Sequence, residues 1–272
     1  MKFKAALCQM HCTGSKEENI AHAGSMVRQA AQSGADIVCL PEIWPCLYGN
    51  EYFRPNAETE DGRLVSSMSG WAAENGIYLV GGTIPLLRGG DMYNSCFVFG
   101  RDGSIIANHD KVHMFDIDVK GGQSFRESDV FTAGDHATTF ETEYGTMGVE
   151  ICFDVRFPEL ARMTALAGAK MIFFPAAFNM TTGPAHWHTN LKARALDNQV
   201  YVAACSPARD ESAPYVDYGH SLVVSPWGDV TAEADETEQT VFAEIDMDRV
   251  EEVREQLPLL SAMRTDLYHV DR

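Results

Sequence analysis

Short apolar runs alternate with amphipathic stretches along the whole chain. Apolar runs bounded by turn residues predict strands, and apolar positions spaced three and four apart predict helices. The predicted strands cover residues 3–9, 36–40, 77–82, 94–99, 105–107, 138–141, 146–151, 171–174, 200–206, 221–224 and 240–245. The predicted helices cover residues 16–33, 63–75, 158–167, 185–198 and 248–256. This alternation is typical of α/β layering.

The two halves of the chain show a similar order of elements. Each begins with a strand, a helix and a second strand that ends in proline, at Pro41 in the first half and at Pro175 in the second. Because no low-complexity linker separates the halves, residues 1–272 are predicted to form one domain. The main alternative is a doubly wound Rossmann-like sheet. Against it, no G-x-G-x-x-G motif follows the first predicted strand, and residues 9–14 offer no phosphate-binding loop.

The chain is strongly acidic, with 21 basic and 39 acidic side chains and a formal net charge of 21 − 39 = −18. This charge is a poor match to nucleic acid and to anionic membrane surfaces, so neither is an expected partner. No apolar stretch is long enough to cross a bilayer, and no secretory leader is expected. The seven cysteines are scattered, odd in number and free of C-x-x-C pairs, which predicts reduced thiols and a cytoplasmic location.

The most informative local pattern lies in residues 148–159. An apolar, β-branched run breaks at Cys152, and Pro158 then opens a helical pattern. A strand that ends at a cysteine just before a helix start predicts a thiol at the carboxyl edge of a sheet, where the helix N-terminus favours the thiolate. A free cysteine is more often buried and inert, so position alone leaves the nucleophilic and the inert thiol almost evenly supported.

Two other residues have the chemistry that such a nucleophile needs. Glu42 follows the apolar strand predicted over residues 36–40, and burial there would raise the pKa of its carboxyl toward that of a general base. Lys111 leaves a predicted strand, and its ammonium could stabilise an oxyanion and lower the pKa of the thiol. Taken singly, Glu42 fits a surface carboxylate better, Lys111 fits a solvated lysine better, and Glu127 is an unremarkable loop carboxylate.

Taken together, these segments resemble the nitrilase, or carbon–nitrogen hydrolase, superfamily. The resemblance is carried by Pro41-Glu42, by Lys111 in its His-Asp-Lys-Val-His setting and by residues 150–159. It covers nearly the whole chain in the same order. It extends to residues 115–119, 177–187, 194–203, 206–210, 219–221 and 225–228. The Phe-Asp-Ile-Asp and Thr-Thr-Gly-Pro-Ala-His-Trp segments within these ranges resemble the omega-amidase branch.

The resemblance implies a four-layer αββα sandwich that pairs with a second copy into an αββα-αββα homodimer or a higher homo-oligomer. It implies that Cys152 is the nucleophile, that Glu42 is the general base and acid, and that Lys111 stabilises the oxyanion. Glu127 matches a fourth, supporting glutamate. The chain departs from its relatives at residues 119–123, where a proline-containing turn is common, and this departure leaves the loop conformation near Glu127 open.

The resemblance also indicates where substrate binds. It implies that Arg156 and the backbone around Phe178 hold the carboxylate end of the substrate, and Tyr48 is a further candidate for lining the same pocket. Arg156 lies at the helix start, where the helix dipole disfavours a cation, so a role toward an anionic substrate is plausible on chemical grounds. From position alone, a salt bridge to a neighbouring acid is equally supported.

This assignment predicts amide hydrolysis through a thioester. Glu42 takes the thiol proton as Cys152 attacks, and Lys111 and the backbone N–H of Phe153 hold the oxyanion. Glu42 then protonates the departing ammonia and activates the water that hydrolyses the thioester. The scheme requires no metal and no cofactor. The expected substrate is a small anionic amide, the terminal amide of a 2-oxo dicarboxylate monoamide such as 2-oxoglutaramate or 2-oxosuccinamate.

Several alternatives stay open at this point. A related carbon–nitrogen hydrolase could act on N-carbamoyl compounds or on deaminated glutathione. A protein of another class, a non-catalytic scaffold or a thiol-redox protein, could use the same fold. The intact set of Glu42, Lys111 and Cys152 counts against a scaffold, and the lack of C-x-x-C counts against redox exchange.

The histidines suggest two further sites that the sequence disfavours. His186 and His188 are spaced so that their rings lie on different sides of a helix, and no third ligand is near in sequence, so a structural or pocket-shaping role is expected in place of metal binding. His109 and His113 could suggest a papain-like Cys–His pair, but the Glu–Lys–Cys set explains more residues.

Overall fold

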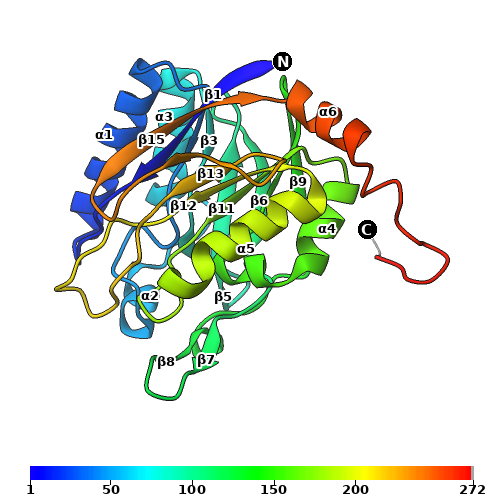
Figure 1. Ribbon diagram of the computed structural model, residues 1–272. Coiled ribbons are helices and arrows are strands. Elements are labelled where there is room, and N and C mark those ends of the chain that lie inside the picture. The colour runs from blue at the N-terminus through cyan, green and yellow to red at the C-terminus, as the bar shows by residue number, and fades with distance from the viewer. Residues whose placement is uncertain (271–272) are drawn as a thin grey trace.

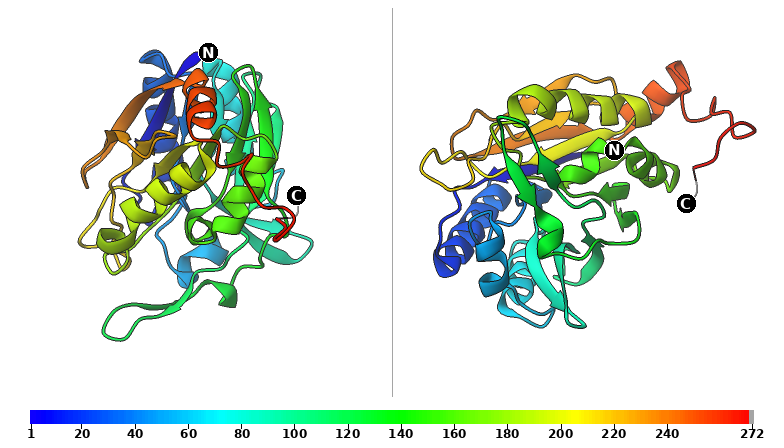
Figure 2. Two further views of the ribbon diagram at one scale, coloured as in Figure 1. Left: turned by 45° about the vertical axis from the view of Figure 1, so that its right-hand side comes forward. Right: turned by 90° about the horizontal axis from the view of Figure 1, so that it is seen from below.

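Two β-sheets lie face to face and helices cover their outer faces in the computed structural model, which describes residues 1–270 (Figure 1). Helices α1 (Lys16–Gln32) and α3 (Arg63–Asn75) pack on the first sheet, and α4 (Pro158–Leu166) and α5 (Gly183–Asn198) lie on the side of the second. Seen from below, the two helix layers lie on opposite sides of the sheets (Figure 2). This order of layers is the αββα sandwich expected from the sequence.

The first sheet has seven strands in the order β15-β1-β2-β3-β5-β4, with β6 also paired to β5. Strands β1, β2 and β3 are parallel to one another, and the remaining pairs are antiparallel. The strands are β1 (Lys2–Gln9), β2 (Ile37–Cys39), β3 (Tyr78–Val80), β4 (Ile84–Arg88), β5 (Asp91–Phe99), β6 (Ile105–Asp110) and β15 (Gln239–Asp246).

The second sheet has six strands in the order β14-β13-β12-β11-β10-β9. Strands β10, β11 and β12 are parallel, so their carboxyl ends meet at one edge of the sheet. The strands are β9 (Thr138–Thr142), β10 (Gly145–Val149), β11 (Met171–Pro175), β12 (Tyr201–Cys205), β13 (Leu222–Val224) and β14 (Val230–Glu233).

The main core lies between the two sheets. Leu7 and Cys39 of the first sheet join one apolar cluster with Val149 and Phe173 of the second. A further cluster lies between the first sheet and helices α1 and α3. The first sheet is therefore covered on both faces, which is why its central strands read as continuous apolar runs instead of alternating ones.

Every strand and helix predicted from the sequence has a counterpart in the structure, but several short elements were not predicted. These are α2 (Asn50–Asn56), β4, β14 and the hairpin of β7 (Asp116–Asp118) and β8 (Ser124–Arg126). Pro55 lies inside α2 and Pro85 inside β4. Proline is disfavoured in regular elements, and β4 tolerates it because β4 is an edge strand.

Two strands end two residues earlier than predicted. The prediction extended β3 to residue 82 and β10 to residue 151, whereas the strands end at Val80 and Val149. The backbone turns out of the extended conformation just beyond them, with a positive φ of 63° at Gly82 and of 44° at Cys152. Both of these turns border the candidate active site.

The remaining elements lie at the periphery. The β7–β8 hairpin projects from the lower end of the molecule in Figure 1, and helix α6 (Asp248–Gln256) lies at the opposite end. Two 3₁₀ helices, η1 (Glu127–Asp129) and η2 (Cys152–Arg156), each begin at a candidate catalytic residue. No helix among residues 1–270 is long and apolar enough to cross a membrane.

Candidate active site

Glu42 lies just beyond the end of β2 in a turn that leaves its side chain only 1% exposed. The backbone N–H of Ile43 donates to Thr83 Oγ1 at 2.8 Å, and Trp44 Nε1 donates to the carbonyl of Gly81 at 2.8 Å. A Cβ at Gly82 would lie 2.2 Å from the carbonyl oxygen of Pro41. The turn at Gly82 and the turn after β2 therefore approach so closely that only glycine fits at position 82, and this contact fixes the backbone that carries Glu42.

Cys152 lies at the turn from β10 into η2, and it is 3% exposed. Its φ of 44° is in the left-handed region, which is uncommon for a residue with a side chain. Strained backbone of this kind clusters at functional sites. The N–H of Phe153 lies in the first turn of η2, where backbone donors have no partner within a helix, so it is available to an oxyanion.

Lys111 follows β6 and extends between two carboxylates. Its Nζ lies 2.8 Å from Glu42 Oε1 and 2.8 Å from Glu127 Oε2, and all three side chains are buried. Glu127 is held in turn, because its Oε2 accepts the backbone N–H of Phe115 at 2.7 Å. The structure therefore brings together Glu42, Lys111 and Glu127 as one buried cluster.

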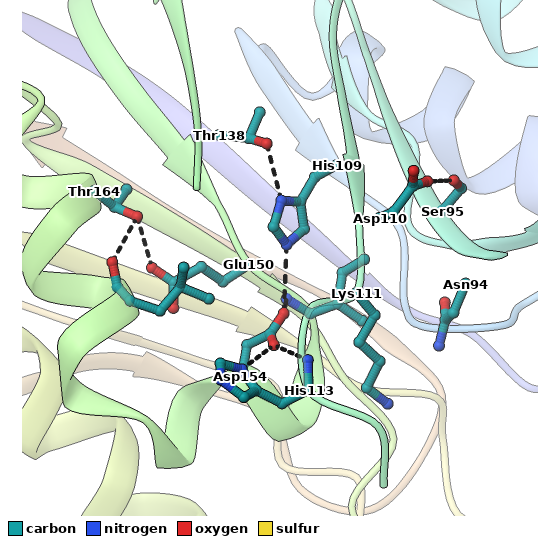
Figure 3. Close-up of polar contacts among 12 residues, drawn as sticks. Asn94, Ser95, His109, Asp110, Lys111, His113, Thr138, Glu150, Asp154 and Thr164 are labelled. Carbon is teal, nitrogen blue, oxygen red and sulfur yellow. Dashed lines mark hydrogen bonds and ion pairs between the residues drawn. The ribbon is translucent and has the colours of Figure 1, made fainter. Parts of the chain in front are cut away.

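Asn94, which the sequence did not identify, completes this cluster. Its Nδ2 donates to Glu42 Oε1 at 2.8 Å and to Glu127 Oε1 at 3.0 Å. The backbone N–H of Lys111 donates to the carbonyl of Asn94 at 2.9 Å. In Figure 3 the Asn94 side chain lies toward the ammonium end of the Lys111 side chain, and both contact Glu42 Oε1. The available signal was a polar Asn-Ser pair inside an otherwise apolar strand.

The pKa values within the cluster follow from burial and charge. Burial raises the pKa of the Glu42 carboxyl above its ordinary value, although Lys111 opposes the effect. Burial alone would lower the pKa of Lys111, but the carboxylates of Glu127 and Glu42 raise it. Lys111 is therefore a permanent cation, and Glu42 has the raised pKa that the sequence predicted.

The pKa of the Cys152 thiol differs from the prediction. Burial raises this pKa well above its ordinary value, the charge of Glu42 raises it further, and Lys111 only partly compensates. The prediction that the helix start and Lys111 would favour the thiolate is wrong in its net direction, because burial outweighs both. A base must therefore remove the thiol proton, and Glu42 is close enough for its charge and that of Cys152 to shift each other's pKa.

Asp154 contacts His109 and His113, which lie on either side of Lys111 in the sequence (Figure 3), and it also bonds to the turn that carries Cys152. Its carboxylate lies 3.3 Å from His109 Nε2 and 2.8 Å from His113 Nδ1, and it accepts the backbone N–H of Ile151 at 3.0 Å. Burial alone would raise the pKa of Asp154, but its hydrogen bonds to the two histidines hold that pKa well below its usual range. The histidines that could have suggested a papain-like pair thus contact Asp154, and sequence spacing alone gave no sign of this role.

Arg156 lies in η2 with its guanidinium against aromatic rings. Its Cζ is 4.9 Å from the ring centroid of Phe178 and 5.4 Å from that of Phe153. Nη1 lies 3.1 Å from His186 Nδ1, and Nε is buried with no hydrogen-bond partner among the described residues. Burial lowers the pKa of Arg156, and the Cys152 charge opposes that shift. Within residues 1–270 Arg156 forms no salt bridge with an acidic side chain, which removes that alternative there.

Tyr48 is buried beside this cluster, with its ring centroid 4.5 Å from that of Tyr215 and 5.6 Å from that of Phe125. Its hydroxyl has no hydrogen-bond partner among residues 1–270. The segment 119–123, whose conformation the sequence left open, forms the tip of the β7–β8 hairpin, and the N–H of Val119 donates to the carbonyl of Gln123 at 3.0 Å. This hairpin leads directly into Glu127.

His186 and His188 point to different partners, as their spacing predicted. His186 contacts Arg156, and His188 Nε2 lies 2.6 Å from Glu233 Oε1. Among the described residues, no group of three or more His, Cys, Asp or Glu side chains is arranged to hold a metal ion.

Comparison with known proteins identifies the class to which this fold and site belong. A model of the carbon–nitrogen hydrolase family matches residues 4–255. The chain therefore belongs to the carbon–nitrogen hydrolase family and is an amide-type hydrolase of the nitrilase superfamily, which confirms the resemblance found in its motifs.

Individual relatives cover nearly the full length. The chain is 48% identical over 270 residues to the omega-amidase NIT2 of Xenopus tropicalis, covering 99% of this chain and 98% of that protein. It is 46% identical over 269 residues to the omega-amidase NIT2 of Homo sapiens, with the same coverage of 99% and 98%. Among solved structures, Saccharomyces cerevisiae Nit3, a member of branch 10 of the nitrilase superfamily, matches with a TM-score of 0.89 at 38% identity, covering 97% of this chain and 96% of that one.

Proposed function

We propose that this enzyme hydrolyses the terminal amide of small 2-oxo dicarboxylate monoamides, such as 2-oxoglutaramate and 2-oxosuccinamate, to the 2-oxo acid and ammonia. The observation that carries the choice of substrate is the guanidinium of Arg156, which lies near Cys152 without an acidic partner within residues 1–270. A partly buried cation of this kind suits a substrate carboxylate. The similarity to the omega-amidase NIT2 proteins supports the same substrate class.

The first half of the reaction forms a thioester. The free oxygen Oε2 of Glu42 takes the proton of the Cys152 thiol as the sulfur attacks the amide carbonyl. The developing oxyanion is stabilised by the ammonium of Lys111 and by the N–H of Phe153. Glu42 then returns the proton to the amide nitrogen, the carbon–nitrogen bond breaks, and ammonia leaves.

The second half of the reaction consumes water. Glu42, again a carboxylate, takes a proton from water as the hydroxyl attacks the thioester carbonyl, and the proton passes to the departing sulfur of Cys152. Glu127 and Asn94 keep Glu42 and Lys111 in place throughout, because both of their side chains bond to members of the pair.

The role of Arg156 can be tested with a panel of 2-oxo acid amides, N-carbamoyl compounds, deaminated glutathione and neutral amides. We expect Arg156→Ala to lower kcat/KM for the 2-oxo dicarboxylate amides by roughly 10- to 100-fold, the value of one charge-assisted hydrogen bond of about 1.5–3 kcal/mol. Neutral amides should be much less affected. Ammonia release measures all of these rates.

The matched control for this test is Arg162→Ala, which removes an arginine of helix α4 that bonds to the carbonyl of Asp197. It should leave the substrate preference unchanged. If the wild type prefers neutral amides and Arg156→Ala changes nothing, the assignment to 2-oxo dicarboxylate amides is wrong.

We further propose that two copies of the chain associate into an αββα-αββα homodimer. Exposed apolar side chains surround one surface cavity of about 250 Å³ between α5 and the end of α6: Leu196, Trp227, Leu257 and Leu259. Trp227 is 46% exposed, and apolar residues grouped in this way mark association surfaces.

Sedimentation velocity tests the dimer. The wild type should sediment as a dimer or larger oligomer, and Trp227→Asp should shift the protein toward the monomer, because a buried tryptophan anchor contributes about 2 kcal/mol or more to binding. Ile105→Asp, at an exposed apolar residue that does not line the cavity, is the control. A wild-type monomer at micromolar concentration would rule the proposal out.

We infer that residues 1–272 act as one domain in the cytoplasm. The core cluster shared by both sheets supports one domain. All seven cysteines are free thiols, which suits a reducing compartment. Detection of the native protein outside the cytoplasmic fraction would contradict this location.

A further inference from the structure

A small cavity adjoins Glu42 below the loop that follows β12. Its volume is about 20 Å³, and it is lined at its buried end by Glu42 and Tyr215. Asp210 and Ala213, which are partly exposed, also line it, so the cavity leads from the catalytic glutamate toward the surface. The volume suits one molecule of the size of water. Arg156 does not line it, so the cavity is distinct from the place proposed for the substrate carboxylate.

Three oxygens of the residues around this cavity are buried without a hydrogen-bond partner among residues 1–270. They are Glu42 Oε2, the hydroxyl of Tyr48 and Asp217 Oδ1. The side chains of Glu42 and Tyr48 are both more than nine-tenths buried. Buried polar atoms are nearly always hydrogen-bonded, so three such oxygens around one cavity point to a small polar ligand.

The wall of the cavity also borders the nucleophile. The hydroxyl of Tyr215, in the cavity wall, donates to the carbonyl of Ala177 at 2.6 Å. The backbone N–H of the same Ala177 lies against the Cys152 thiol. Glu42 and the wall formed by these groups therefore lie between the cavity and the place where ammonia is released at Cys152.

We propose that this cavity is the site through which the ammonia product leaves the thioester, held by Glu42, Tyr48 and Asp217. The inference rests on the amidase function proposed above. It assigns Asp217 and Tyr48 a role in binding the leaving group, separate from the binding of the 2-oxo acid part of the substrate.

The chemistry balances with groups already named. When the carbon–nitrogen bond breaks, the electron pair stays on nitrogen and the proton from Glu42 completes ammonia, so that Glu42 becomes a carboxylate with Oε2 free to accept. Ammonia then moves into the cavity without any bond being made or broken, and water takes its place beside the thioester. In the reverse direction, the nitrogen of ammonia attacks the thioester carbonyl and gives a proton to Glu42. The carbon–sulfur bond then breaks, the sulfur of Cys152 takes that proton from Glu42, and the amide is regenerated.

The lining can satisfy every hydrogen-bonding group of ammonia. Ammonia has three N–H donors and one acceptor, and the cavity offers three oxygens able to accept, of which the Tyr48 hydroxyl can also donate. The carboxyls of Glu42 and Asp217 both line the cavity, and the buried ammonium of Lys111 already pairs with Glu42 and Glu127. Burial and then the charge of Glu42 raise the pKa of the Asp217 carboxyl well above its ordinary value.

The experiment compares two reactions of the same thioester, attack by ammonia, which regenerates the amide, and attack by water, which gives the 2-oxo acid. The enzyme is incubated with 2-oxoglutaramate and ammonium labelled with heavy nitrogen, and the reaction is stopped before the amide is consumed. Mass spectrometry then gives the ratio of label incorporated into the remaining amide to 2-oxo acid formed. Because exchange and hydrolysis start from the same thioester, loss of folded protein does not change this ratio.

We expect the wild type to incorporate label and Asp217→Asn to lower the ratio about tenfold, as loss of one buried hydrogen bond would. Ala213→Val, which fills the cavity without removing a charge, should lower the ratio as well, and it decides the question alone if Asp217→Asn does not fold. Glu211→Gln removes an exposed charge from the same loop and should leave the ratio unchanged.

Other results would overturn the proposal. An absence of label in the wild-type amide, or an unchanged ratio in both cavity variants, would show that the cavity does not serve ammonia. A higher ratio in Asp217→Asn would assign the cavity to the incoming water. If the wild type releases ammonia from no amide of the panel, the proposed function itself fails and the inference falls with it. If the wild type hydrolyses the amides but both cavity variants keep the wild-type ratio, the role of the cavity is excluded and the proposed amidase function stands.

Discussion

Cys152→Ala is expected to abolish ammonia release from every amide that the enzyme hydrolyses, with a loss on the order of 10⁶-fold in kcat, comparable to the loss of the nucleophile in other covalent hydrolases. The physical reason is that the reaction passes through a bond to the sulfur. The buried cluster of Glu42, Lys111 and Glu127 has no second nucleophile within it. The measurements are steady-state ammonia release and the mass of the acyl-enzyme trapped by acid quench.

Cys46→Ala is the matched control, because Cys46 is also buried near Glu42 but takes no part in the scheme. It should retain activity and still accumulate the acyl-enzyme mass, which Cys152→Ala should not show. Retained turnover in Cys152→Ala would contradict the thioester mechanism.

Lys111→Ala has the second-largest expected effect. Loss of an oxyanion donor should lower kcat by roughly 10² to 10³-fold. The same change leaves the buried carboxyls of Glu42 and Glu127 without their cation, and breaking a buried ion pair costs about 3–5 kcal/mol of stability. The pKa of Glu42 should then rise further, so the acidic limb of the pH profile of kcat/KM should move to higher pH.

The two consequences of Lys111→Ala are measured separately. Urea unfolding gives the stability, and kcat is normalised to the folded fraction by circular dichroism at each pH. Lys120→Ala, on the exposed tip of the β7–β8 hairpin, is the control and should change neither quantity. A folded Lys111→Ala enzyme with nearly normal kcat would exclude Lys111 from oxyanion stabilisation.

The sequence was most informative where a local pattern and a family motif coincide. Glu42 and Cys152 both lie just beyond strand ends, as predicted, but β2 and β10 belong to different sheets, so the expectation of one shared sheet edge is wrong. The face-to-face packing of the two sheets brings both residues to one site. The long apolar strands and the amphipathic helices followed from their periodicity. Short elements such as β7 and β8 did not, because three residues carry too little periodic signal and their conformation depends on tertiary contacts.

Other parts of the site depend on contacts that no spacing in the sequence reveals. Asn94 reaches the two glutamates only through the pairing of β5 with β6, in which Ser95 lies opposite Asp110. Asp154 contacts His109 and His113, which lie more than 40 residues away in the sequence. The sign of the Cys152 pKa shift was predicted wrongly because the depth of burial, which decides it, is a property of the assembled fold.

Cys152 is one of four non-glycine residues among residues 1–270 with a left-handed backbone, the others being Ile43, Gln199 and His220. Only glycine adopts such a φ without a steric penalty, which is about 1 kcal/mol or more for other residues. The thiol needed for catalysis is therefore kept at a position where the backbone conformation alone would favour glycine. Laboratory evolution that selects for heat resistance without selecting for turnover should drift toward glycine here, and an inactive, more robust descendant would be its natural end point.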